Sequence, residues 1–227
     1  MKNIKNSSKL IRVLTAALGL LGFSFGMYLT IQANIGLAPW DVLAMGISKR
    51  TPLSFGDVTA IISFVVLIVD LLMKERIGVG TILDAIITGK GVDLFTALKI
   101  VPQQTTLLGG VFVMLLGMTV LSVAAWIYMS TAMCYGPRDS LLVGLGKRLR
   151  RLPIGLVEIL LQGVVLAVGW LLGGPVGIGT VISAFGLGVV LQIVFSIVRF
   201  EPRDVNHQSL FEFFGVKPKK QQKPAQC

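Results

Sequence analysis

Two aspartates at matching positions are the residues of this chain with the clearest capacity for chemistry. Asp41 ends the run Pro39–Asp41, and Asp139 ends the run Pro137–Asp139. Proline is preferred at the first position of a helix, so each aspartate is predicted near the third residue of a short helix. Capping of the positive helix end is the simpler interpretation. The alternative is a pair of acids that binds a cation or relays protons, because ionisable groups are costly inside a membrane.

Further residues extend this candidate site. Arg138 could pair with either aspartate as a structural salt bridge, and Asp84 lies well inside an apolar segment. The glycines of Gly78–Thr81 and Gly177–Thr180 could expose backbone amides to an anion at a helix start, although tight turns and close packing explain them more simply. The predicted substrate-binding residues are therefore Asp41, Asp139, Arg138, Asp84, Gly78, Gly80, Gly177 and Gly179.

Long apolar segments must position these residues. Of the 227 residues, 54% are apolar and 14% charged, whereas a soluble domain carries roughly 25% charged residues. The uncharged stretches are 13–32, 60–69, 105–134, 160–174 and 176–198. About 20 apolar residues suffice to cross the hydrocarbon core of a bilayer. Too little polar surface would remain to cover five such segments in water, so the chain is predicted to be an all-α polytopic transmembrane bundle.

The order of these elements repeats along the chain. Residues 39–50 align with residues 137–148 at one constant offset, and six positions agree, including Pro, Asp, Gly and Lys-Arg. The Gly-x-Gly-Thr runs at 78–81 and 177–180 align at an offset one residue larger. This order predicts an internal duplication. The expected divisions are a cytoplasmic N-terminus at 1–9, transmembrane repeats at 10–100 and 101–200, and a basic cytoplasmic tail at 201–227.

The number of membrane crossings depends on the two short helices. If they dip into the membrane and return, each half has three spans and the halves are inverted, a common transporter architecture. If they cross, each half has four spans and the halves are parallel. A helix of about 18 Å falls short of the roughly 30 Å core. Length therefore favours six full spans plus two short helices, re-entrant or half, with eight spans as the alternative.

The net charge of +10 lies at the ends of the segments. This distribution fits the positive-inside rule and predicts a bacterial inner-membrane protein with both termini in the cytoplasm. It does not form the basic, aromatic-rich face of a nucleic-acid-binding domain. We expect the lysine-rich tail at 217–223 to attract anionic lipid. The spacing of Gly22 and Gly26 fits close helix packing, within the chain or between copies in a homo-oligomer.

The sequence offers little for catalysis. Cys134 and Cys227 have no metal-binding spacing, and the one histidine, His207, lies in the tail. No phosphate loop, nucleophile triad or metal cluster is present in the sequence. We therefore expect no enzyme, no metal and no cofactor.

The duplicated Gly-x-x-Pro-x-Asp-x-Leu helix, followed by a Gly-x-Gly-Thr segment start, resembles the YczE/YitT group of bacterial membrane proteins. The resemblance covers about residues 13–200 and is closest to the YczE branch through residues 36–43. The second copy departs from this pattern, since Arg138 replaces Trp40. The long soluble C-terminal domain typical of the YitT branch is absent from the sequence. The resemblance implies a cell-membrane protein with a duplication and implies no particular activity.

Together these patterns predict a transporter or permease for an unknown small molecule or ion, with its site at the repeat interface. The alternative is a non-transporting membrane scaffold or regulatory protein.

Overall fold

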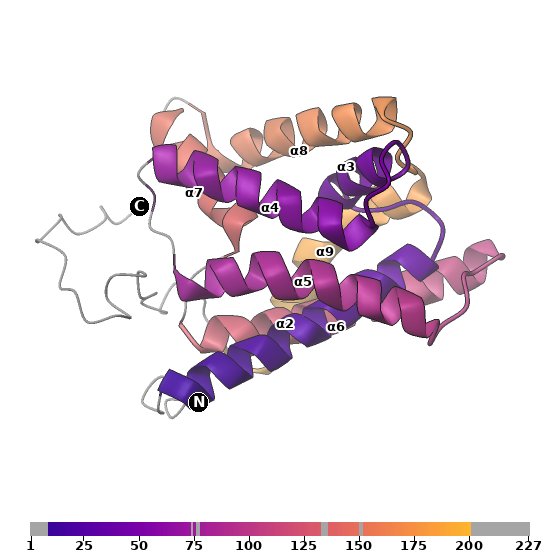
Figure 1. The fold of residues 1–227 in the computed structure, drawn as a ribbon, viewed down its shortest axis with the longest axis horizontal. Helices are drawn as coiled ribbons and strands as arrows, with labels where there is room; N and C mark the ends of the chain where they lie inside the picture. Colours follow the sequence, from indigo (N-terminus) through magenta and orange to yellow (C-terminus); the bar gives the residue numbers. More distant parts are fainter. Residues whose placement is uncertain (1–8, 74, 76–77, 133–135, 150–151, 201–227) are drawn as a thin grey trace, which may run out of the picture.

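The computed structural model describes residues 9–73, 75, 78–132, 136–149 and 152–200. This part contains eight α-helices and no strand (Figure 1). The helices are α2 (Lys9–Gln32), α3 (Pro39–Ser48), α4 (Phe55–Leu72), α5 (Val79–Leu98), α6 (Leu107–Ser130), α7 (Pro137–Arg148), α8 (Ile154–Leu171) and α9 (Ile178–Ile197). The first four have 24, 10, 18 and 20 residues and the last four have 24, 12, 18 and 20. The same order of helix lengths therefore occurs twice.

Five helices, α2, α4, α6, α8 and α9, are long and apolar enough to cross a membrane. The sixth long helix, α5, carries Asp84, Lys90 and Asp93. Lys90 forms an ion pair of 2.6 Å with Asp57 of α4, and Asp93 accepts a hydrogen bond of 2.9 Å from the amide of Gly56. These partners satisfy two of the three charges where α5 packs against α4. The polytopic helical bundle predicted from the sequence is confirmed.

The long helices α2 and α6 run antiparallel and pack along each other (Figure 1). Arg12, near the start of α2, donates hydrogen bonds of 3.0 and 2.7 Å to the carbonyl of Thr131, just past the end of α6. At the opposite end, the carbonyl of Gln32 accepts a bond of 2.8 Å from the amide of Gln104, just before α6. A Cβ on Gly26 would meet the backbone of α6 at 2.8 Å. The predicted small-residue packing at this glycine therefore occurs within the chain.

Neither short helix crosses the bundle. Helix α2 ends and α4 begins at one end of the molecule, and α6 ends and α8 begins at the other (Figure 1). The chain turns back after α2 at Asn34 and Gly36, which have φ angles of 54° and 113°. The carbonyl between them, on Ile35, accepts a bond of 2.7 Å from the amide of Gly179. The described residues therefore contain six long helices and two short helices that do not run the length of the bundle (Figure 1). The choice between six spans with re-entrant helices and eight spans stays a prediction.

Each short helix packs on a long helix of the other half, α3 on α8 and α7 on α4. At the end of α3, Arg50 donates a bond of 2.9 Å to the carbonyl of Leu172, which follows α8. At the end of α7, Arg148 donates a bond of 3.0 Å to the carbonyl of Met73, which follows α4. Cationic side chains stabilise helix C-termini by such contacts. The Lys-Arg pair that recurs in the sequence therefore caps the opposite half of the molecule.

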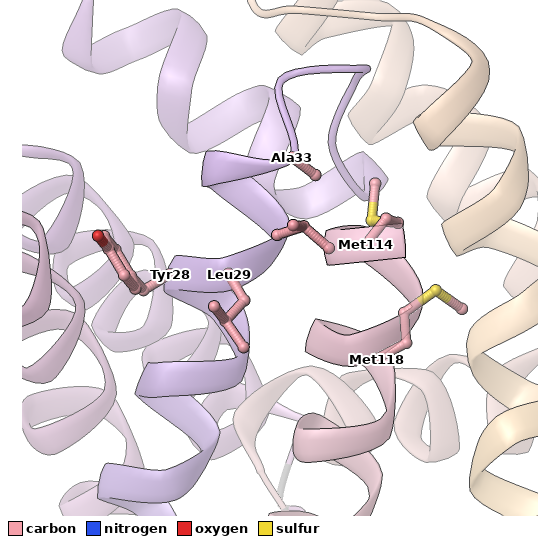
Figure 2. Close-up of a cluster of buried hydrophobic side chains, with 6 residues drawn as sticks. Tyr28, Leu29, Ala33, Met114 and Met118 are labelled. Carbon is pink, nitrogen blue, oxygen red and sulfur yellow. The ribbon is translucent and has the colours of Figure 1, made fainter. Parts of the chain in front are cut away.

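The best-buried apolar cluster lies between α2 and α6 and includes Tyr28, Leu29, Ala33, Met114 and Met118 (Figure 2). The phenol of Tyr28 donates a hydrogen bond of 2.8 Å to the carbonyl of Val101 and accepts one of 2.9 Å from the amide of the same residue. This residue therefore fixes the connection between α5 and α6. Outside the core, many large apolar side chains of the long helices are exposed, as expected for a bundle surrounded by lipid.

Candidate functional site

The candidate site lies where the N-terminal ends of α3 and α7 meet. Each helix begins with a buried proline, Pro39 or Pro137, after an extended residue, Ala38 or Gly136. Proline suits this position because it has no amide hydrogen to leave unsatisfied. The two helices come from different halves of the chain and point their positive ends toward a shared region. The segment Pro39–Asp41 and the segment that begins at Pro137 therefore supply the polar groups at this point.

Asp41 and Arg138 are the groups that meet. One Nη atom of Arg138 lies 3.6 Å from Oδ1 of Asp41, and the guanidinium carbon lies 5.2 Å from the centre of the Trp40 ring. Asp41 is only 5% exposed, and its Oδ1 accepts no hydrogen bond among the described residues. A buried carboxylate oxygen is rarely left in this state. The aspartate therefore retains acceptor capacity for a small polar molecule or ion.

A cavity of about 380 Å³ opens from this ion pair toward α8 and α9. Its polar lining includes Asp41 and Arg138, and the remaining polar lining residues are Thr30, Tyr128, Glu158, Gln162 and Ser183; the other walls are mainly apolar. The amide of Gln162 donates a bond of 3.1 Å to the carboxylate of Glu158. Small-molecule sites have a comparable character, with apolar walls, a few polar groups and roughly 300–1,000 Å³ of space.

A second cavity, of about 100 Å³, lies on the side of Arg138 that faces α4 and α5. Thr59 and Ser63 of α4 and Asp84 and Thr88 of α5 line it. The hydroxyl of Thr88 donates a bond of 2.7 Å to the carboxylate of Asp84. The structure therefore brings Asp84 to Arg138 but places it in a different cavity from Asp41.

The two cavities are built from equivalent positions. The offset that relates Gly78 to Gly177 also relates the pairs lining the cavities, which are Thr59 and Glu158, Ser63 and Gln162, Asp84 and Ser183, and Thr88 and Leu187. Arg138, Phe23, Met27 and Tyr128 line both cavities. The cavities thus flank one shared polar centre and differ in the chemistry of their outer walls.

Helix packing explains the difference in size. A Cβ on Gly56 of α4 would collide with the carbonyl oxygen of Gly89 of α5. The equivalent glycines of the second half, Gly155 of α8 and Gly188 of α9, have nothing within 4 Å of a Cβ. Helices α4 and α5 are therefore closed over the small cavity, whereas α8 and α9 stand apart beside the large one.

The glycine amides that were predicted to face an anion have hydrogen-bond partners within the chain at Gly78, Gly177 and Gly179. The amide of Gly78 donates a hydrogen bond of 3.4 Å to the hydroxyl of Thr81. The amide of Gly177 donates one of 3.2 Å to the hydroxyl of Thr180. The amide of Gly179 is bonded to Ile35. Gly80 lies in the first turn of α5, and none of these glycines lines either described cavity. The contacts at Gly78, Gly177 and Gly179 correspond to the simpler interpretation of helix starts and close packing.

Asp139 occupies the third position of α7, equivalent to Asp41 in α3. Its side chain lies outside the described part of the structure, so its predicted role stays a prediction. Within the described residues, no three His, Cys, Asp or Glu side chains come together as a metal site.

Several polar lining residues were not singled out as site residues from the sequence, among them Trp40, Gln162, Thr59 and Ser63. Thr59, Ser63 and Gln162 belong to polar pairs four residues apart in the long helices, Thr59 with Ser63 and Glu158 with Gln162, and Asp84 has the same spacing to Thr88. Residues at that spacing share one helix face. This spacing is the sequence signal that could have identified them.

Comparison with known proteins shows the family to which the chain belongs. Residues 10–196 match the model of a family of unknown function, DUF6198. The chain belongs to this family. It is 34% identical over 190 residues to an uncharacterized protein of Haemophilus influenzae, covering 84% of this chain and 85% of the relative.

Two Bacillus subtilis relatives are also similar. The uncharacterized membrane protein YczE is 28% identical over 176 residues, covering 77% of this chain and 80% of YczE. The uncharacterized protein YyaS is 30% identical over 184 residues, covering 80% and 90%. No solved structure is significantly similar to the chain. The resemblance to the YczE group is confirmed, and with the apolar helices it supports a multi-pass membrane protein.

Proposed function

We propose that this protein is a small membrane transporter that moves a small polar molecule or ion through the point where its two halves meet. The observation that carries the proposal is the contact between Asp41 and Arg138 at the N-terminal ends of the two short helices. Transporters with inverted repeats commonly bind substrate at such interrupted helices, between the repeats. Transport, rather than catalysis, is the function that this arrangement supports.

An inverted duplication supports the same proposal. Arg50 caps the end of α8 as Arg148 caps the end of α4, and α2 and α6 run in opposite directions. We infer that the halves are duplicated copies with opposite orientation. Inverted halves can exchange conformations: α4 and α5 would separate while α8 and α9 close against each other. Substrate would then reach the centre from each side of the membrane in turn.

The end of the molecule that carries α7 is proposed to face the cytoplasm of a bacterial cell. Lys147 and Arg148 end α7, α2 begins at the same end of the molecule (Figure 1), and the positive-inside rule favours that orientation. The basic tail, outside the described residues, would then lie beside the anionic inner leaflet.

Reconstitution tests the transport proposal. Proteoliposomes containing the full chain are incubated with a defined mixture of amino acids, organic acids, organic cations and inorganic ions, and retained solutes are measured by mass spectrometry. We expect at least one solute to accumulate above protein-free liposomes. Asp41→Asn should reduce its uptake about tenfold or more, because loss of a specific charged contact costs more than 1.4 kcal/mol.

Thr119→Val is the control, since this exposed hydroxyl donates to the carbonyl of Leu115 in its own helix, α6, and lines neither cavity. It should retain uptake. Equal uptake by wild type and Asp41→Asn, at equal protein abundance, would contradict the proposed site. Absence of any protein-dependent uptake would contradict transport of these solute classes.

A further inference from the structure

The small cavity between α4 and α5 is lined by an unusual concentration of oxygen donors. Thr59, Ser63 and Thr88 contribute hydroxyl groups, and Asp84 contributes a carboxylate. The three hydroxyl residues are between 2% and 5% exposed. Apart from Arg138, the remaining lining residues are Phe23, Met27, Tyr128, Gly136 and Pro137. A half-open polar pocket with one acidic group therefore lies in an otherwise apolar bundle.

Thr59 shows that this pocket has unused bonding capacity. Its hydroxyl oxygen is buried and has no hydrogen-bond partner among the described residues. Most buried hydroxyl groups are satisfied, and an exception calls for a structural or functional explanation. The residue packs on the face of α4 that also carries Ser63 one turn later, and both line the same space. A bound ligand with affinity for oxygen lone pairs would account for this group.

We propose that the cavity lined by Thr59, Ser63, Asp84 and Thr88 binds a sodium ion. Hard cations prefer carboxylate, hydroxyl and carbonyl oxygens. A single carboxylate balances one positive charge, which favours a monovalent over a divalent ion. A volume of about 100 Å³ holds the ion with one or two waters, each of about 30 Å³. A proton on Asp84 could be shared with at most one of the surrounding hydroxyl oxygens, whereas a cation can be coordinated by several of them.

Arg138 connects this sodium site to the substrate centre. It lines both cavities, pairs with Asp41 and also interacts electrostatically with Asp84. Sodium bound at Asp84 repels the guanidinium and holds it against Asp41, whereas loss of sodium lets Arg138 move toward Asp84. Sodium binding thereby changes the charge available to a substrate at Asp41. This coupling rests on the proposed transport function, but sodium binding itself does not.

Thermal unfolding of the purified full-length protein in detergent tests the site without requiring transport. We expect the melting temperature to rise and saturate as NaCl replaces choline chloride at constant ionic strength. Potassium should require about tenfold higher concentrations, because selectivity between cations follows cavity size. Thr59→Val and Asp84→Asn should lose the sodium response. Thr96→Val should keep it, since Thr96 is an exposed threonine on the same helix α5.

Each result bears on the proposal separately from uptake measurements. No difference between NaCl and choline chloride for the wild type would overturn it. A full sodium response in Thr59→Val would equally contradict coordination by the hydroxyl groups, and stabilisation by lower pH without sodium would assign the site to a proton. Arg138→Gln should reduce the half-saturating sodium concentration several-fold, because the competing cation is gone. An unchanged value would overturn the coupling through Arg138.

Discussion

At the residue scale, burial makes the Asp41–Arg138 pair sensitive to the loss of one partner. Arg138→Gln leaves the buried carboxylate of Asp41 without its cation, which should destabilise the protein by roughly 1–3 kcal/mol. Asp41→Asn combined with Arg138→Gln should recover part of that loss, because no uncompensated charge remains. Thermal unfolding of the two single variants and the double variant in detergent measures the coupling.

The Lys90–Asp57 pair provides the comparison. It is shorter, at 2.6 Å, but the Lys90 side chain is 65% exposed. Exposed ion pairs contribute little to stability because water screens them. Lys90→Gln should therefore leave the melting temperature nearly unchanged. Strictly additive effects of the Asp41 and Arg138 substitutions would contradict a direct interaction between them.

Much of the centre could be predicted from residue type alone. The sequence identified Asp41, Arg138 and Asp84 because charged groups are conspicuous in apolar segments. It did not reveal that Asp41 and Asp84 line different cavities with Arg138 between them. That arrangement depends on how α3 and α7 pack on the opposite halves, which no local pattern encodes. Thr59 was harder to recognise, because a hydroxyl group in an apolar helix usually bonds its own backbone.

At the element scale, two equivalent glycines have different surroundings. A Cβ at Gly56 would collide with Gly89 and with the carboxylate of Asp93, whereas Gly155 has open space. Gly56→Ala should therefore destabilise the protein by roughly 1–3 kcal/mol through overpacking. Gly155→Ala should have almost no effect on stability. Unfolding curves of both variants in the same detergent provide the measurement, and equal losses would contradict the observed difference in helix packing.

The elements themselves were largely predictable. The proline starts of the short helices and the Gly-x-Gly-Thr starts of α5 and α9 agree with the observed helix bounds. The separation of α8 from α9 was not predictable, because Gly155 and Gly188 repeat the pattern of Gly56 and Gly89. Identical local patterns give different packing here, so the difference arises from tertiary contacts.

At the scale of the whole molecule, the positions of the two short helices determine the end of the molecule at which the loops after them lie. Thr51 follows α3 and is exposed, at the end of the molecule opposite α7. In a background with Cys134 and Cys227 replaced by serine, Thr51→Cys should react with a membrane-impermeant maleimide in intact cells. Leu149→Cys, after α7, should react only once the membrane is permeabilised. The reverse pattern would contradict the orientation inferred from the basic residues.

The central claim is that the two inverted halves exchange their packing around the Asp41–Arg138 centre. The most direct measurement uses a variant in which Cys134 and Cys227 are replaced by serine and Gly155→Cys and Gly188→Cys are introduced. This variant is cross-linked in membranes, and the digested protein is analysed by mass spectrometry. Gly163→Cys with Gly188→Cys is the control, because Gly163 also faces open space but its counterpart in the first half is Phe64. We expect a short bifunctional reagent to join the first pair, as α8 and α9 transiently adopt the closed packing of α4 and α5. A yield no higher than that of the control pair would contradict the exchange.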